Sequence, residues 1–147
     1  MSANVLRRCA AVAGVALLLA LPFVGKWARR DTEARCDLDG AALVTNYRVR
    51  VEDAAGKSHD FCCIRCAELW LERQTGPARA VRVRDERSGA EIEADAAHYV
   101  RSLVITTPTT GNRIHAFRDS ADAQRHAETC RGTILLAGER PFVARRE

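Results

Sequence analysis

The 147 residues are enough for a membrane segment and one small folded core, but not for two large domains. The net charge of +4 includes five basic residues at or before Arg30, which leaves 18 lysines and arginines against 19 acidic residues in the remainder. This balance argues against a basic nucleic-acid-binding surface, and we expect no nucleic-acid partner.

The first 30 residues have the pattern of a membrane anchor or a signal segment. Residues 9–24 carry no charge, and basic residues flank them on both sides. As a helix this stretch would span about 24 Å, slightly less than a bilayer core of about 30 Å. The sequence around Gly25 is a poor cleavage site, so we expect an uncleaved single-pass anchor in the inner membrane. The remaining residues, 31–147, then form one extracytoplasmic domain.

The domain is expected to begin with a hairpin followed by a helix. Residues 47–51 alternate apolar and charged side chains, which is the period of a half-buried strand. A turn over 53–57 and a returning strand over 58–62 would complete the hairpin. From Cys63 to Gln74 the apolar positions follow a helical period.

The rest of the domain predicts more strands and a second helix. That helix is capped by Asp119 or Ser120 and ends near Thr129. The strands are expected at 81–84, around Ile92, and at 103–105, 114–117 and 133–136. The sum is an α+β domain, an antiparallel sheet with two helices, preceded by an N-terminal membrane helix.

Four cysteines are placed as ligands of a soft metal ion. Cys62, Cys63 and Cys66 stand where the predicted hairpin runs into the helix, and Cys36 stands upstream in a glycine-containing turn. Thiols three or four residues apart at a helix start converge, and the helix terminus favours their deprotonation. A trigonal set of Cys36, Cys62 and Cys66 would suit Cu(I), which we expect as the bound metal.

A fourth ligand would make Zn(II) possible as the alternative ion. His59, Cys63 and Asp39 are the candidates, since each lies close in sequence to a predicted thiolate ligand. Cys130 stands apart, at the end of the second predicted helix. A lone cysteine there is typical of a small buried side chain, and its functional alternative is an added ligand or a resolving thiol.

Other functions of the cysteines are a thiol redox pair, a structural zinc module for protein interaction, or structural disulfides. The pair Cys63 and Cys66 at a helix start fits redox chemistry, but the βαβ pattern of a thioredoxin-like fold is missing. Adjacent Cys62 and Cys63 are poor disulfide partners for each other. The sequence shows no nucleophile triad, paired carboxylates or phosphate-binding glycine loop, so we expect no enzymatic activity.

Two segments resemble the NosL-type copper-binding accessory proteins. Residues 99–135 look like the family's ending, in which a strand and an Ala-Phe step lead into a helix and a closing strand. Residues 36–70 look like the NosL cysteine segment and like TRASH and YHS-type metal modules, where Phe-Cys followed four positions later by Cys is typical. By this resemblance, Cys62 and Cys66 carry the ligand role and Cys63 is additional.

The resemblance implies a metal-carrying role for residues 31–147. NosL-like proteins use a methionine near the metal, whereas Met1 is the only methionine of this chain. We therefore predict a Cu(I) metallochaperone or metal-handling accessory protein, held in the membrane through residues 9–24. It would pass its ion to a metal-receiving protein, with Cys63 or His59 assisting the transfer.

Overall fold

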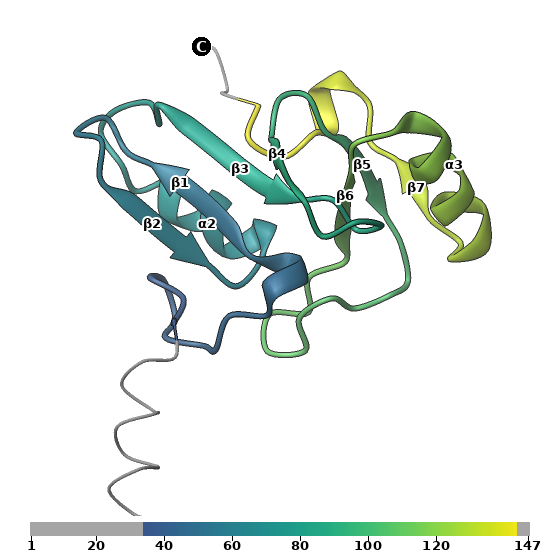
Figure 1. Cartoon of the computed structure of the whole chain (residues 1–147), viewed down its shortest axis with the longest axis horizontal. Helices are drawn as coiled ribbons and strands as arrows, with labels where there is room; N and C mark the ends of the chain where they lie inside the picture. The colour runs from purple at the N-terminus through teal and green to yellow at the C-terminus, as the bar shows by residue number, and fades with distance from the viewer. Residues whose placement is uncertain (1–33, 144–147) are drawn as a thin grey trace, which may run out of the picture. The chain divides into compact units, whose positions relative to one another are not determined.

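The computed structural model describes residues 34–143, so the predicted membrane anchor lies outside the described residues. Within residues 34–143, no helix has the length and hydropathy that crossing a bilayer requires. The described part contains two small antiparallel sheets and two α-helices (Figure 1). The predicted α+β class with two helices is therefore confirmed, and the expectation of one sheet is corrected to two.

The first sheet has the strand order β2-β1-β3-β4, in which every pair of neighbours is antiparallel. Its elements are η1 (Thr45–Tyr47), β1 (Val49–Glu52), β2 (Ser58–Phe61), α2 (Ile64–Leu71), β3 (Ala80–Arg84) and β4 (Glu91–Glu93). The hairpin of β1 and β2 pairs Val49 with Phe61. The helix α2 packs against both strands of this hairpin (Figure 1).

The second sheet has the order β6-β5-β7, and α3 packs against all three of its strands. Its elements are β5 (His98–Arg101), β6 (Ile114–Phe117), α3 (Ser120–Thr129), β7 (Thr133–Ile134) and η2 (Ala137–Glu139). Asp119 caps α3, because its side chain accepts a hydrogen bond of 2.7 Å from the Ala121 amide. An isolated parallel bridge between Asp85 and Ala116 joins the two sheets.

The core has two parts that meet at β5. Tyr99 belongs to the larger cluster, which also holds the hairpin residues and four of the cysteines, and Val100 belongs to the smaller cluster under α3. Both side chains are fully buried. The Tyr99 hydroxyl donates a hydrogen bond of 2.7 Å to the Ala94 carbonyl, which satisfies its polar atom. The strand β5 is thus covered on both faces.

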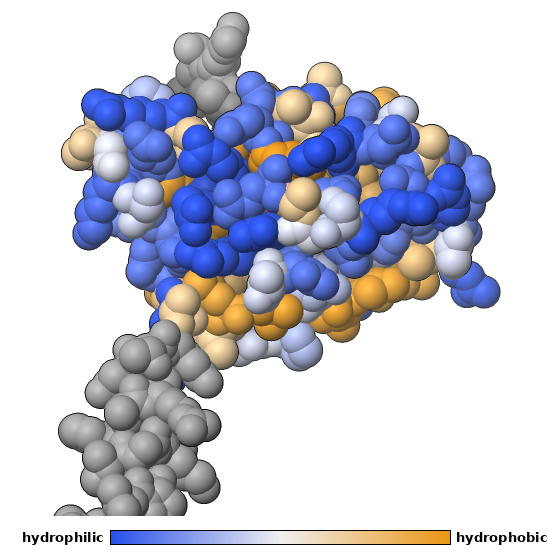
Figure 2. All heavy atoms as spheres, in the orientation of Figure 1, coloured by the Kyte–Doolittle hydropathy of each residue, from blue (hydrophilic) through white to orange (hydrophobic). Residues whose placement is uncertain are grey.

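The prediction of a strand at residues 103–105 is wrong. Leu103, Val104 and Ile105 are 59%, 42% and 47% exposed and belong to the connection between β5 and β6. The Ser102 hydroxyl accepts the Val104 amide and the Leu103 amide donates to the Cys130 carbonyl, so these groups are not available to a sheet. Apolar surface follows the lower edge of the molecule in Figure 2, over this connection.

Two other predicted boundaries are corrected. The first helix is shorter than the expected Cys63–Gln74, because α2 ends at Leu71 and the chain continues in tight turns closed by the Arg73 and Gln74 amides. The last strand covers only Thr133–Ile134 of the expected 133–136; Leu136 is exposed and precedes the short helix η2.

Candidate metal centre

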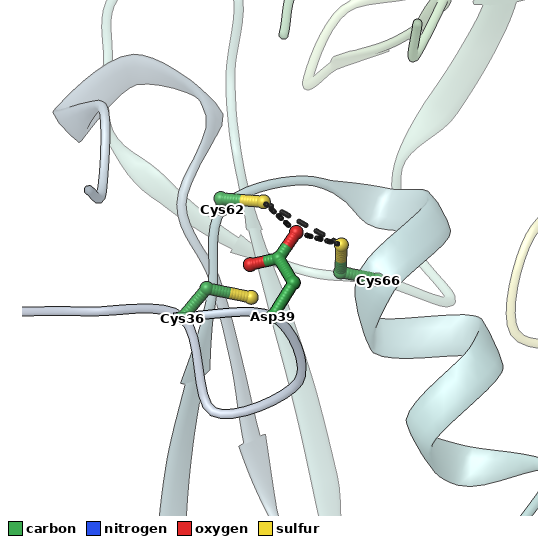
Figure 3. Close-up of side chains that lie close together, drawn as sticks. All are labelled: Cys36, Asp39, Cys62 and Cys66. Atoms are coloured by element: carbon green, nitrogen blue, oxygen red, sulfur yellow. Dashed lines mark hydrogen bonds between the residues drawn. The ribbon is translucent and has the colours of Figure 1, made fainter. Parts of the chain in front are cut away.

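Four ligand atoms converge between the N-terminal turn and the start of α2 (Figure 3). They are the sulfurs of Cys36, Cys62 and Cys66 and a carboxylate oxygen of Asp39, and all lie within 4.8 Å of one another. The Sγ atoms of Cys62 and Cys66 are 3.5 Å apart. Asp39 Oδ2 lies 3.4 Å from the Cys66 sulfur and 3.8 Å from the Cys62 sulfur.

Cys36 and Asp39 are positioned by a tight loop of residues 36–41, called here the knuckle loop. The Cys36 amide donates to the Ala41 carbonyl at 2.8 Å, and the Gly40 amide donates to the Cys36 carbonyl at 2.9 Å. Gly40 has a φ of 71°, a conformation that glycine adopts without a steric penalty. The Asp39 side chain accepts the Ala41 amide through Oδ1, which leaves Oδ2 to face the thiols.

The knuckle loop is fixed to the hairpin by β2. The Asp37 amide donates to the Asp60 carbonyl at 2.8 Å, and the Asp60 amide donates to the Asp37 carboxylate at 3.1 Å. Asp60 is in turn held by Arg48, whose Nε lies 2.7 Å from its carboxylate. These contacts bring the loop beside the strand that leads into Cys62. Residues 23 or more positions apart in the sequence therefore share one site.

The other two sulfurs come from the junction of β2 and α2. Cys62 follows the buried end of β2, Cys63 is the extended N-cap residue, and Cys66 lies in the first turn of the helix. Cys62 precedes the extended N-cap residue, so the bend of the chain from β2 into α2 brings its sulfur to 3.5 Å from that of Cys66. The helix N-terminus carries partial positive charge, which favours thiolates at this point.

Burial disfavours ionisation of the Cys62 and Cys66 thiols, whose pKa values are raised. Cys36, Cys62 and Cys66 are at most 3% exposed. Burial, together with the neighbouring Cys63, raises the pKa of the Cys62 and Cys66 thiols well above the ordinary value. A metal ion must therefore displace these protons when it binds, so that loading the site releases them to solvent.

Asp39 supplies a negative charge to the site before the thiols ionise. Partial burial opposes its ionisation, but hydrogen bonds from the Ala41 amide and from the thiols of Cys36, Cys66 and Cys62 outweigh this and lower the pKa of its carboxyl. Its side chain lies on the exposed side of the cluster, whereas the three cysteines are buried. The carboxylate thus stands between the sulfurs and solvent.

Cys63 is not one of the four groups whose ligand atoms converge, although its sulfur lies near that of Cys62. Its sulfur lies 3.3 Å from Thr110 Oγ1 and 3.9 Å from the Cys62 sulfur, and it is fully buried. Thr110 belongs to the loop between β5 and β6, and the Thr107 hydroxyl of the same loop donates to the Cys62 carbonyl at 3.5 Å. This loop therefore covers the Cys63 side of the junction.

His59 is not brought into the cluster. Its Nδ1 lies 3.3 Å from the Asp37 carboxylate and its Nε2 lies 3.1 Å from the Asp53 carboxylate. Its ring packs on Trp70 at 4.4 Å between centroids, one helical turn beyond Cys66. Both ring nitrogens thus already have acidic neighbours.

Cys130, the C-cap residue of α3, does not join the cluster either, and its sulfur lies 3.9 Å from His126 Nδ1. These two residues are four positions apart near the end of the predicted helix, a spacing that places helical side chains on the same face. The predicted alternative role of Cys130 as an added ligand of the cluster is therefore not supported by the fold.

Comparison with known proteins finds a likeness among solved structures. No family model matches the chain, and no characterised protein sequence matches it. Among solved structures, the copper chaperone NosL from Shewanella denitrificans is similar, with a TM-score of 0.63 at 20% sequence identity. The match covers 74% of this chain and 90% of that one. The chain therefore has a NosL-like fold, and the resemblance indicated by its residues is confirmed at the level of the fold.

Proposed function

We propose that this protein is a Cu(I) carrier that binds the ion through Cys36, Cys62 and Cys66 and delivers it to a metal-receiving protein. The observation that carries the proposal is the convergence of these three buried sulfurs with one carboxylate. The similar solved structure is named a copper chaperone, not an enzyme, and we assign no catalytic activity to this chain.

The sulfur geometry suits trigonal coordination. Metal–sulfur bonds of about 2.3 Å in a trigonal plane place the sulfurs about 4.0 Å apart. The Cys62 and Cys66 sulfurs are 3.5 Å apart and all the ligand atoms lie within 4.8 Å of one another, so small side-chain adjustments would complete the site. Thiolates select soft ions, of which Cu(I) is the biological example that accepts three sulfurs.

Release would proceed from the Asp39 side. The carboxylate is exposed, while Cys63 on the other side is fully buried under the Thr110 loop. An incoming thiol or imidazole from a partner would therefore approach past Asp39 and replace the cysteines one at a time. We further propose that residues 9–24 hold the protein in the inner membrane, with the domain on the extracytoplasmic side.

The proposal predicts one tight Cu(I) site that depends on the cluster. The full chain, purified anaerobically with its thiols reduced, would be titrated with Cu(I) in competition with a colorimetric chelator. We expect the tight site to vanish in the triple variant Cys36→Ser, Cys62→Ser and Cys66→Ser, and we expect binding to release protons in the wild type. Equal Cu(I) binding by the folded triple variant would refute the proposal.

A carrier must also release its cargo without unfolding. Excess chelator added to the loaded protein should remove the copper while the far-ultraviolet circular dichroism stays unchanged. Loss of the folded signal on metal removal would instead identify a structural metal module.

The position of the Asp39 carboxylate supports a second candidate function, a four-coordinate Zn(II) site of three cysteines and one carboxylate. The substitution Asp39→Asn distinguishes the two ions. For trigonal Cu(I) we expect affinity to change by less than about threefold, since carboxylate oxygen is not a preferred Cu(I) ligand. A bound Zn(II) would lose a charged ligand, and its affinity should fall by more than about tenfold. Parallel titrations with both metals measure the difference.

A further inference from the structure

A second pair of soft ligands lies on α3, apart from the cysteine cluster. His126 and Cys130 are four positions apart at the C-terminal end of this helix, and His126 Nδ1 lies 3.9 Å from the Cys130 sulfur. Metal–sulfur and metal–nitrogen bonds of about 2.3 Å and 2.0 Å allow separations between roughly 3.5 Å in tetrahedral and 4.3 Å in linear geometry. One ion can therefore bond to both atoms with little movement of either side chain.

The His126 ring is held in place by its neighbours. It packs against the ring of buried His115 at 4.3 Å between centroids and against Phe117 at 5.1 Å. Its Nε2 lies 3.4 Å from the Ser102 hydroxyl oxygen. This arrangement resembles that of histidine ligands generally, in which one ring nitrogen is fixed by a hydrogen bond and the other faces the metal.

The other polar neighbour of the His126 ring is at Nε2, so Nδ1 is the nitrogen that faces Cys130. Ser102 Oγ lies 3.0 Å from His115 Nε2 and 3.4 Å from His126 Nε2, and His115 Nε2 also lies 3.3 Å from the Val104 carbonyl oxygen. An ion bound at His126 Nδ1 requires the ring proton on Nε2, where the Ser102 oxygen is placed to accept it.

We propose that His126 Nδ1 and Cys130 Sγ form a second binding site for Cu(I), distinct from the cysteine cluster. The site goes beyond the carrier function assigned above, and its geometry does not depend on that function. Two ligands of this type satisfy Cu(I), which accepts low coordination numbers, but not Zn(II), which is bound with four.

The location also favours a cation. Cys130 is the C-cap residue of α3, and the last turn of a helix exposes carbonyl groups with partial negative charge. Both side chains are partly exposed, so an ion can reach them from solvent, in contrast to the buried sulfurs of the cluster. We therefore expect this site to bind more weakly and to exchange faster.

The residues next to His126 do not form a hydrolytic active site. Glu86, His115 and Ser102 have the order of a carboxylate–histidine–serine triad, but the Ser102 side chain is buried, with 3% of the residue exposed. His115 Nδ1 is also outside hydrogen-bonding geometry with Glu86. A substrate could not reach the Ser102 hydroxyl, and its oxygen already accepts the Val104 amide.

The test is a Cu(I) titration of four full-length proteins under reducing conditions. Wild type should bind two ions, the Cys130→Ser variant only the tight one, and the triple variant of Cys36, Cys62 and Cys66 only the weak one. In the triple variant, adding Cys130→Ser should abolish Cu(I) binding. X-ray absorption of the copper-loaded triple variant should show one sulfur and one nitrogen ligand.

Substitutions of two histidines test whether His126 itself binds the ion. His126→Gln should weaken the second site by at least about tenfold, while His98→Gln, at an exposed position on β5, should leave it unchanged. The inference is overturned if the folded triple variant binds no Cu(I), or binds it equally well with Cys130→Ser. Retention of the tight site in the triple variant would instead refute the carrier proposal, so the two failures are distinct.

Discussion

Replacing Cys66 with serine is expected to weaken Cu(I) binding at the cluster by more than about 100-fold, because outer-shell changes alone cost up to that much. Cys66 Sγ lies 3.5 Å from Cys62 Sγ and 3.4 Å from the Asp39 carboxylate. A serine hydroxyl is a hard donor that Cu(I) does not favour. Competition against a Cu(I) chelator of known affinity measures the loss.

Cys63→Ser is the matched control for this variant. It removes a thiol from the same junction, but that thiol is not one of the four converging groups and lies 3.3 Å from Thr110 Oγ1 and 3.9 Å from the Cys62 sulfur. We expect a much smaller loss for Cys63→Ser than for Cys66→Ser. Equal losses in the two variants would mean that Cys63 is a ligand in the loaded protein and that the trigonal assignment is wrong.

The part of the site that depends on one segment could be predicted from the sequence. Cys62 and Cys66 are four positions apart at the junction where the predicted hairpin runs into the helix, so their closeness in sequence keeps their side chains near each other. The approach of Cys36 depends on the pairing of Asp37 with Asp60, which is a tertiary contact. The glycine turn made that approach plausible, but no local pattern required it.

The sequence did not decide which residue other than a cysteine lies at the site. Asp39 and His59 were both possible fourth ligands from the sequence, yet only Asp39 faces the sulfurs. Its backbone turn at Gly40 directs the carboxylate inward, whereas His59 is drawn between Asp37 and Asp53 beside Trp70. The contacts of His59 with these carboxylates depend on the tertiary structure and cannot be predicted from the spacing of residues in the sequence.

The fold was predictable where one face of an element is polar. The alternation of buried and less buried residues in β1 and the capping of α3 by Asp119 both agree with the structure. The strand β5 was missed because Tyr99 and Val100 are adjacent and both buried, one in each core cluster. A strand covered on both faces loses the alternating pattern by which strands are recognised.

Shortening Phe61 to alanine is expected to destabilise the reduced, metal-free protein by about 3–5 kcal/mol, the usual cost of emptying a large aromatic site in a core. Phe61 is fully buried, pairs with Val49 in the hairpin register, and packs against Trp70 at 5.4 Å between ring centroids. Its removal leaves a cavity under the junction that positions Cys62. Denaturant unfolding followed by circular dichroism measures the free energy of unfolding.

Leu103→Ala provides the control, since this side chain is 59% exposed and its loss should change the free energy of unfolding by no more than about 0.5 kcal/mol. Saturating Cu(I) should return part of the stability lost in Phe61→Ala, because an ion that binds only the folded state stabilises it by mass action. A loss below about 1 kcal/mol in Phe61→Ala would contradict a core built around this hairpin. Lack of any stabilisation by Cu(I), in a variant that still folds, would show that the sulfurs no longer converge once the support beneath Cys62 is removed.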